Sequence, residues 1–115
     1  MKNQSIKHLI ASVAATLVLI QPSYGSTIRG GSDCGKWIKE NQSDNFAALS
    51  MRAWLVGFMS GMNLIYSLHN KNDDRLSNIK SNQQMYLWMD NYCQKNPLND
   101  VDDGAVTLFN ELKNK

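Results

Sequence analysis

Histidine, cysteine and proline are scarce in this sequence, which limits the chemistry it can support. There are two histidines and two cysteines among 115 residues, and no C-x-x-C pair occurs. A zinc site or a redox pair needs more such ligands, closer together, than this chain offers. A nucleophile also needs a base beside it, and His69, the only histidine beyond the first 25 residues, has no such neighbour in the pattern. We therefore expect no enzyme, no catalytic residue and no cofactor.

Calcium binding is not predicted either. Asp100, Asp102 and Asp103 are clustered, but the twelve-residue loop with a central glycine and a terminal glutamate is missing. Aspartates at a helix start are better explained by the helix dipole, which favours negative charge there. We expect no metal site.

The first 25 residues have the organisation of a secretory signal peptide. Lys2 and Lys7 precede an apolar run over residues 9–20, and the small residues Ser23 and Gly25 fit the −3 and −1 positions of a cleavage site. The run is short of the roughly 20 residues that span a bilayer. We predict cleavage after Gly25 and a periplasmic or secreted product without a stable membrane anchor; an uncleaved anchor is the alternative.

Removal of this segment changes the charge of the protein. The precursor has 12 basic and 10 acidic residues, and Lys2 and Lys7 are lost on cleavage with no acidic residue. The mature chain is therefore neutral and has no basic excess with which to bind a phosphate backbone. We expect no nucleic-acid partner.

The two cysteines have a simple explanation in an exported protein. The compartment is oxidising and no third cysteine competes, so we predict a disulfide between Cys34 and Cys93. In the chain-entropy model, closing so long a loop stabilises the fold by about 4 kcal/mol.

Apolar residues recur at steps of three and four along most of the mature chain, and no segment alternates like a strand. Residues 26–33 are expected to form a flexible leader, and residues 34–115 a single all-α domain of four helices. These helices are expected at 34–41, at about 45–69, from 82 to the Asn96-Pro97 pair, and from 99 or 100 onward. The expected core stripe of the second helix is Met51, Trp54, Leu55, Phe58, Met62, Ile65 and Tyr66.

Two glycines lie four residues apart in that second helix. Gly57 and Gly61 each lower helix stability by about 1 kcal/mol relative to alanine, which indicates that another element approaches closely. We expect a neighbouring helix of the same fold near Trp54, Gly57 and Gly61; a homodimer contact is the alternative.

The segment from 70 to 81, "NKNDDRLSNIKS", is polar and long for a connection between helices. It is a candidate partner contact through Asp73, Asp74, Arg75 and Leu76. A solvated linker is the alternative.

The order "DCGKWI", "AWLVGFMSGMN" and "YCQKNPL", followed by a last short helix, resembles the HdeA/HdeB family of small periplasmic acid-stress proteins. The resemblance covers about residues 33–112 and rests on Cys34, Cys93, Trp54 and the Asn96-Pro97 pair. The segments "GFMSG" and "GAVTLFNEL" are instead similar to the Rap/Tai immunity proteins of type VI secretion.

These resemblances, together with the missing catalytic residues, imply a bacterial, non-enzymatic protein-binding module in the periplasm. An HdeA/HdeB-like chaperone would bind unfolded clients after acid loosens its fold. An immunity protein would bind one dedicated toxin while staying folded. A small subunit of an envelope complex is a third alternative.

Overall fold

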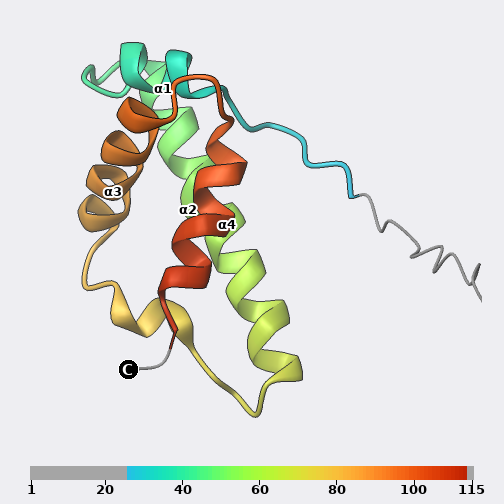
Figure 1. Ribbon diagram of the computed structural model, residues 1–115. Helices are drawn as coiled ribbons and strands as arrows, with labels where there is room; N and C mark the ends of the chain where they lie inside the picture. Colours follow the sequence, from blue (N-terminus) through green and yellow to red (C-terminus); the bar gives the residue numbers. More distant parts are fainter. Residues whose placement is uncertain (1–25, 114–115) are drawn as a thin grey trace, which may run out of the picture.

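The computed structural model describes residues 26–113, so the predicted signal peptide lies outside the described residues. Four α-helices and one 3₁₀ helix make up this part of the chain, which contains no strand, and the predicted four-helix all-α domain is confirmed (Figure 1). The helices are α1 (Cys34–Glu40), α2 (Phe46–His69), η1 (Arg75–Asn78), α3 (Asn82–Lys95) and α4 (Val101–Glu111).

Helix α2 begins at Phe46, within one residue of the expected start at about 45. Asn45 is the N-cap, and its side chain accepts a hydrogen bond from the Ala48 amide at 2.8 Å. Ser43 and Asp44 just before it are also of residue types that often cap helices, but they make other contacts. The Ser43 hydroxyl donates to the Glu40 carbonyl at 2.8 Å, and the Asp44 carboxylate pairs with Arg52 at 3.7 Å. Several residue types can cap a helix, so contacts with nearby residues select among adjacent candidates.

The end of α3 and the start of α4 follow local chemistry. Asn96 is the C-cap of α3 directly before Pro97, which disfavours helical geometry at the residue before it. Asp100 is the N-cap of α4, and its amide donates to the Asp103 carboxylate at 3.3 Å. Both boundaries agree with the sequence prediction.

The hydrophobic core lies where one stripe from each α-helix meets the others. Its buried members are Cys34, Trp37, Met51, Leu55, Met59, Met85, Met89, Cys93, Val101, Ala105, Leu108 and Phe109. The expected stripe of α2 is wrong at two positions, because Met59 is fully buried whereas Ile65 is 59% exposed. Since α2 is apolar on more than one side, spacing alone does not identify the buried face.

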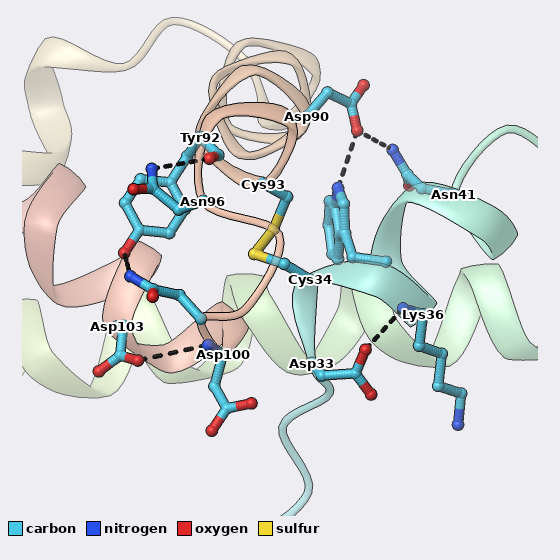
Figure 2. Close-up of a disulfide and its surroundings, with 12 residues drawn as sticks. Asp33, Cys34, Lys36, Asn41, Asp90, Tyr92, Cys93, Asn96, Asp100 and Asp103 are labelled. Atoms are coloured by element: carbon cyan, nitrogen blue, oxygen red, sulfur yellow. Dashed lines mark hydrogen bonds between the residues drawn. A yellow bond between two sulfur atoms is a disulfide. The ribbon is translucent and has the colours of Figure 1, made fainter.

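The disulfide joins the first residue of α1 to the last turn of α3, as predicted (Figure 2). Both cysteines are fully buried, and their Cα atoms lie 4.8 Å apart. Trp37, one turn after Cys34, is also fully buried and donates through Nε1 to the Asp90 carboxylate at 2.8 Å. The covalent link and this hydrogen bond together hold α1 against α3.

Helices α3 and α4 approach each other closely at a glycine that the spacing argument did not single out. Gly104 in α4 is buried against α3, and a Cβ there would lie 2.7 Å from Met89 Sδ and 2.8 Å from Tyr92 Cδ1. The lack of a side chain at this position therefore allows α3 and α4 to pack closely.

Candidate protein-binding surface

Helix α2 has a second apolar face that the rest of the described chain leaves uncovered. Arg52 is its only Lys, Arg, Asp or Glu residue, and none occurs from residue 53 to the end of the helix. We call the exposed side the outer face of α2; it consists of Phe46, Leu49, Ser50, Ala53, Gly57, Ser60, Gly61, Leu64, Ile65 and Leu68. Leu64 and Leu68 are 60% and 68% exposed, and Phe46 is 85% exposed. A helix that is apolar all round is normally buried, so the outer face lacks a cover.

A shallow groove of about 890 Å³ adjoins this face. It runs along the C-terminal half of α2 to the end of α4, where the two helices lie side by side (Figure 1). Its lining is almost wholly apolar: Ser26, Gly57, Phe58, Gly61, Met62, Ile65, Tyr66 and Phe109. The groove and the outer face share Gly57, Gly61 and Ile65 and so form one continuous surface.

Gly57 and Gly61 do not contact a neighbouring helix of the described chain, contrary to our expectation. Both are exposed, and a Cβ added at either would meet no atom within 4 Å. The two glycines therefore lower the stability of α2 without any compensating close packing among residues 26–113. The neighbouring helix expected at this spacing is therefore not found among the described residues, and the homodimer contact stays a prediction.

Trp54 has a different role from the helix contact predicted for it. Its indole Nε1 donates to the Arg29 carbonyl at 2.9 Å, and its ring stacks on Phe58 with centroids 4.9 Å apart. A Cβ at Gly30 would lie 2.9 Å from the Trp54 ring, and the φ of this residue is +85°. Both the close contact and the left-handed backbone conformation favour glycine here. Trp54 thus packs the N-terminal segment, not another helix, against α2.

These contacts also move the start of the ordered domain toward the N-terminus. Ser32 accepts a backbone hydrogen bond from the Val101 amide at 2.8 Å, and Asp33 forms an isolated β-bridge with Asp100. Residues 29–33 fall within the expected flexible leader, and the structure shows that their polar backbone finds partners on α2 and at the start of α4.

The predicted partner loop is attached to the bundle through η1. The Arg75 guanidinium lies 3.9 Å from the centre of the Tyr66 ring and 5.1 Å from that of Phe109. It donates to the Tyr66 hydroxyl at 2.8 Å and to the Phe109 carbonyl at 3.3 Å. Since Tyr66 and Phe109 line the groove, Arg75 supports one groove wall.

The other residues named in that loop have varied surroundings. Asp74 accepts a hydrogen bond from Asn63 Nδ2 at 2.8 Å and caps η1, and Leu76 is packed against the core. Asp73 is partly buried and lines a small cleft with His69 at the end of α2. Arg75, Asp74 and Leu76 are therefore used in contacts within the chain, and a partner contact through this loop stays a prediction.

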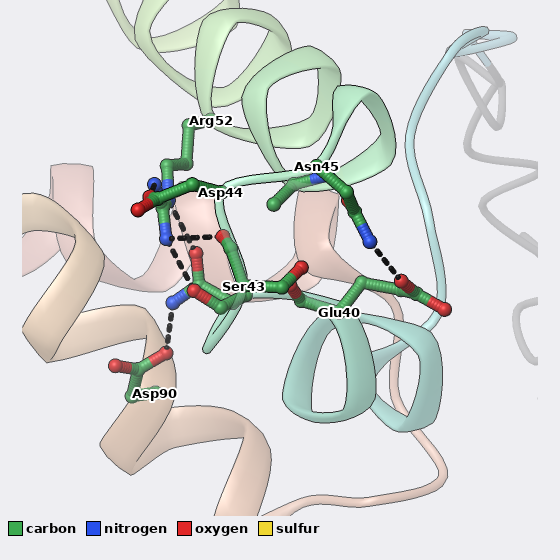
Figure 3. Close-up of polar contacts among 8 residues, drawn as sticks. Glu40, Ser43, Asp44, Asn45, Arg52 and Asp90 are labelled. Carbon is green, nitrogen blue, oxygen red and sulfur yellow. Dashed lines mark hydrogen bonds and ion pairs between the residues drawn. The ribbon is translucent and has the colours of Figure 1, made fainter.

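A polar cluster joins α1, α2 and α3 on another side of the bundle (Figure 3). Asp90 accepts hydrogen bonds from Trp37 and from Asn41 Nδ2, the latter at 2.6 Å. Asn41 in turn accepts from Arg52 Nε at 2.7 Å, and a second guanidinium nitrogen donates to the Asn41 backbone carbonyl. Arg52 also pairs with the exposed Asp44 at 3.7 Å. Through these contacts Asp90 and Arg52 hold α1, α2 and α3 together.

No three His, Cys, Asp or Glu side chains in residues 26–113 come together as a metal site. The same part of the chain contains no helix with the length and apolar character needed to cross a membrane.

No known protein family, curated protein or solved structure matches this chain. The fold and the surface alone thus define its class: a small helical protein, linked by one disulfide, with an uncovered apolar helix face.

Proposed function

We propose that this chain is a non-enzymatic protein-binding module that acts in the periplasm or outside the cell. Its outer face of α2 and the adjoining groove would hold apolar segments of other proteins. The observation that carries this proposal is that α2 exposes a long uncharged apolar face although the same helix also supplies the core.

The energetics favour binding at this surface. Complete burial of a leucine or isoleucine side chain contributes about 1.5–3 kcal/mol, so covering Leu64, Ile65 and Leu68, each more than half exposed, recovers roughly 1 kcal/mol or more apiece. Contiguous apolar patches of this kind on a monomer commonly mark interaction sites. The face lies on one helix anchored by the core, so little conformational entropy is lost on binding.

The resemblance to the HdeA/HdeB family supports a chaperone form of this activity. The described chain has nine basic and ten acidic side chains, and protonating the carboxylates in acid would leave the basic groups uncompensated. Self-repulsion of that charge favours a looser fold, which would enlarge the apolar surface available to clients. The disulfide would limit the loosening by keeping α1 joined to α3.

The test is a client-aggregation assay with the oxidised mature protein at neutral and acidic pH. Leu64→Glu combined with Leu68→Glu places two charges on the outer face and should abolish suppression of aggregation. Leu87→Glu is the matched control, because Leu87 is 62% exposed but lies on α3 away from this face. Equal suppression by both variants would refute the proposed surface.

A dedicated toxin partner gives a different result in the same experiment. A protein that stays folded and suppresses no client aggregation at either pH is not a chaperone, and the search would then turn to a single tight partner.

A further inference from the structure

We propose that the outer face of α2 is covered by the α2 helix of a second copy of this chain, running antiparallel about a two-fold axis at Gly57. This inference rests on the proposed function, because the second copy would occupy the same surface that is proposed to bind clients. A client and the second copy would therefore compete.

Four of the five large outer-face residues are placed symmetrically about Gly57, whereas the fifth, Leu64, has Ser50 as its counterpart. Phe46 and Leu68 each lie eleven residues from it, and Leu49 and Ile65 each lie eight residues from it. In an antiparallel pair centred at Gly57, each residue therefore meets its counterpart: Phe46 of one copy lies opposite Leu68 of the other, and Leu49 lies opposite Ile65. All four side chains are more than half exposed in the single chain. This self-complementarity is what a two-fold interface requires.

The centre of the same face is made of small residues. Ala53 and Gly61 lie four residues on either side of Gly57, so each would meet the other across the axis. No atom of the described chain lies within 4 Å of a Cβ placed at Gly57 or Gly61, so a second backbone can approach closely there. The large residues at the two ends would then flank a close central crossing, as ridges flank a groove in helix packing.

Charge does not oppose the pairing. Outer-face residues carry no ionised side chain, so two identical faces bring no like charges together. Ile65 also lines the groove, so Leu49 of the second copy would lie at the groove edge. The second copy would therefore cover the outer face of α2 and reach the edge of the groove.

The size of the face predicts how strong this dimer is. At 1.5 Å per residue the 24 residues of α2 extend about 36 Å, and a strip about 10 Å wide along them covers roughly 360 Å² per copy. The total of about 700 Å² is below the 1,200 Å² or so of stable interfaces, so we expect a dimer that exchanges at about micromolar concentration or above. A client could then displace the second copy.

Cysteine cross-linking tests the arrangement. Under mild oxidation, Gly57→Cys should form a dimer linked at that position, because the axis brings its two copies together. Gly61→Cys alone should not, since its two copies are eight residues or about 12 Å apart along the helices, beyond the Cα separation of a disulfide. An equal mixture of Gly61→Cys and Ala53→Cys should cross-link again.

The alternatives give distinct patterns. Linking of Gly61→Cys to itself as strongly as Gly57→Cys would indicate parallel helices and overturn the proposed geometry. Leu87→Cys on α3 is the control for random collision, and its cross-linking at an equal rate would also overturn the proposal. The native cysteines are fully buried and already paired, so they should not exchange.

Sedimentation of the mature protein at pH 7, from about 1 to about 500 µM, tests the association itself. The unmodified protein should pass from monomer to dimer, and Gly57→Glu should raise the dissociation constant at least about tenfold by placing two like charges at the axis. Gly57→Glu retains the fold because its position is open, which circular dichroism can verify. A monomer throughout the range refutes the dimer but leaves client binding intact, whereas a dimer that protects no client refutes the proposed function alone.

Discussion

The same substitution, glycine to alanine, should have opposite effects at two positions in this protein. Gly57 on α2 faces open space, whereas Gly104 on α4 faces Met89 and Tyr92 at less than 3 Å from a hypothetical Cβ. In both helices alanine gains about 1 kcal/mol of helix propensity over glycine. The two sites therefore differ mainly in the space available for the new methyl group.

At Gly57 nothing opposes the gain in propensity, so Gly57→Ala should stabilise the monomer by about 1 kcal/mol. At Gly104 an added methyl group overpacks the core at a cost of about 1–3 kcal/mol. The flexible end of the Met89 side chain can move to make room for part of the methyl group. The Tyr92 ring cannot move as easily, because it is packed against the core and stacked on Trp88, with centroids 5.3 Å apart. The gain in helix propensity is the same for both variants. Their free energies of unfolding should therefore differ by the overpacking cost of about 1–3 kcal/mol.

Urea unfolding of the oxidised mature protein, at a concentration where it is monomeric, measures this difference. Thermal unfolding gives an independent estimate, since 1 kcal/mol corresponds to about 4–8 °C in a domain of this size. Equal shifts in the same direction for the two variants would refute the contrast drawn from their surroundings.

Three other substitutions test the contacts that hold the helices and the N-terminal segment. Replacing both cysteines with serine should lower the free energy of unfolding by about 4 kcal/mol, as measured by urea titration against the wild type, and an unchanged midpoint would contradict the entropic argument. Asp90→Ala leaves the Trp37 and Asn41 donors without their acceptor and should cost about 1–3 kcal/mol, whereas Asp44→Ala, whose carboxylate is exposed, should have little effect in the same titration. Trp54→Phe removes the hydrogen bond to Arg29, so limited proteolysis should cut residues 26–33 faster with the domain intact; equal cutting rates would count against this attachment.

Local features of the structure follow closely from the sequence. The C-cap of α3 at Asn96, the N-cap of α4 at Asp100 and the disulfide between Cys34 and Cys93 all agree with the predictions. Each depends on a few neighbouring residues or, for the disulfide, on the absence of any other cysteine. Such arguments need no knowledge of how the helices are arranged.

The candidate surface was less accessible to sequence reasoning. The spacing of Gly57 and Gly61 did indicate a special face, but Ile65 was assigned to the core and Gly104 was not singled out. Arg75 was predicted to contact a partner; the structure adds that its guanidinium lies over the Tyr66 ring and near the Phe109 ring, two residues that line the groove. Which of two apolar faces is buried depends on where the other helices lie.

The four helices, their approximate ends and the covalent link between α1 and α3 can be predicted from the chain, because periodicity, capping and cysteine pairing depend on residue types and short spacings. The packing of the helices shows which glycine permits a close helix contact and which side of α2 is left uncovered by the described residues. Those properties depend on α4 packing against one face of α2 while no described element covers the other.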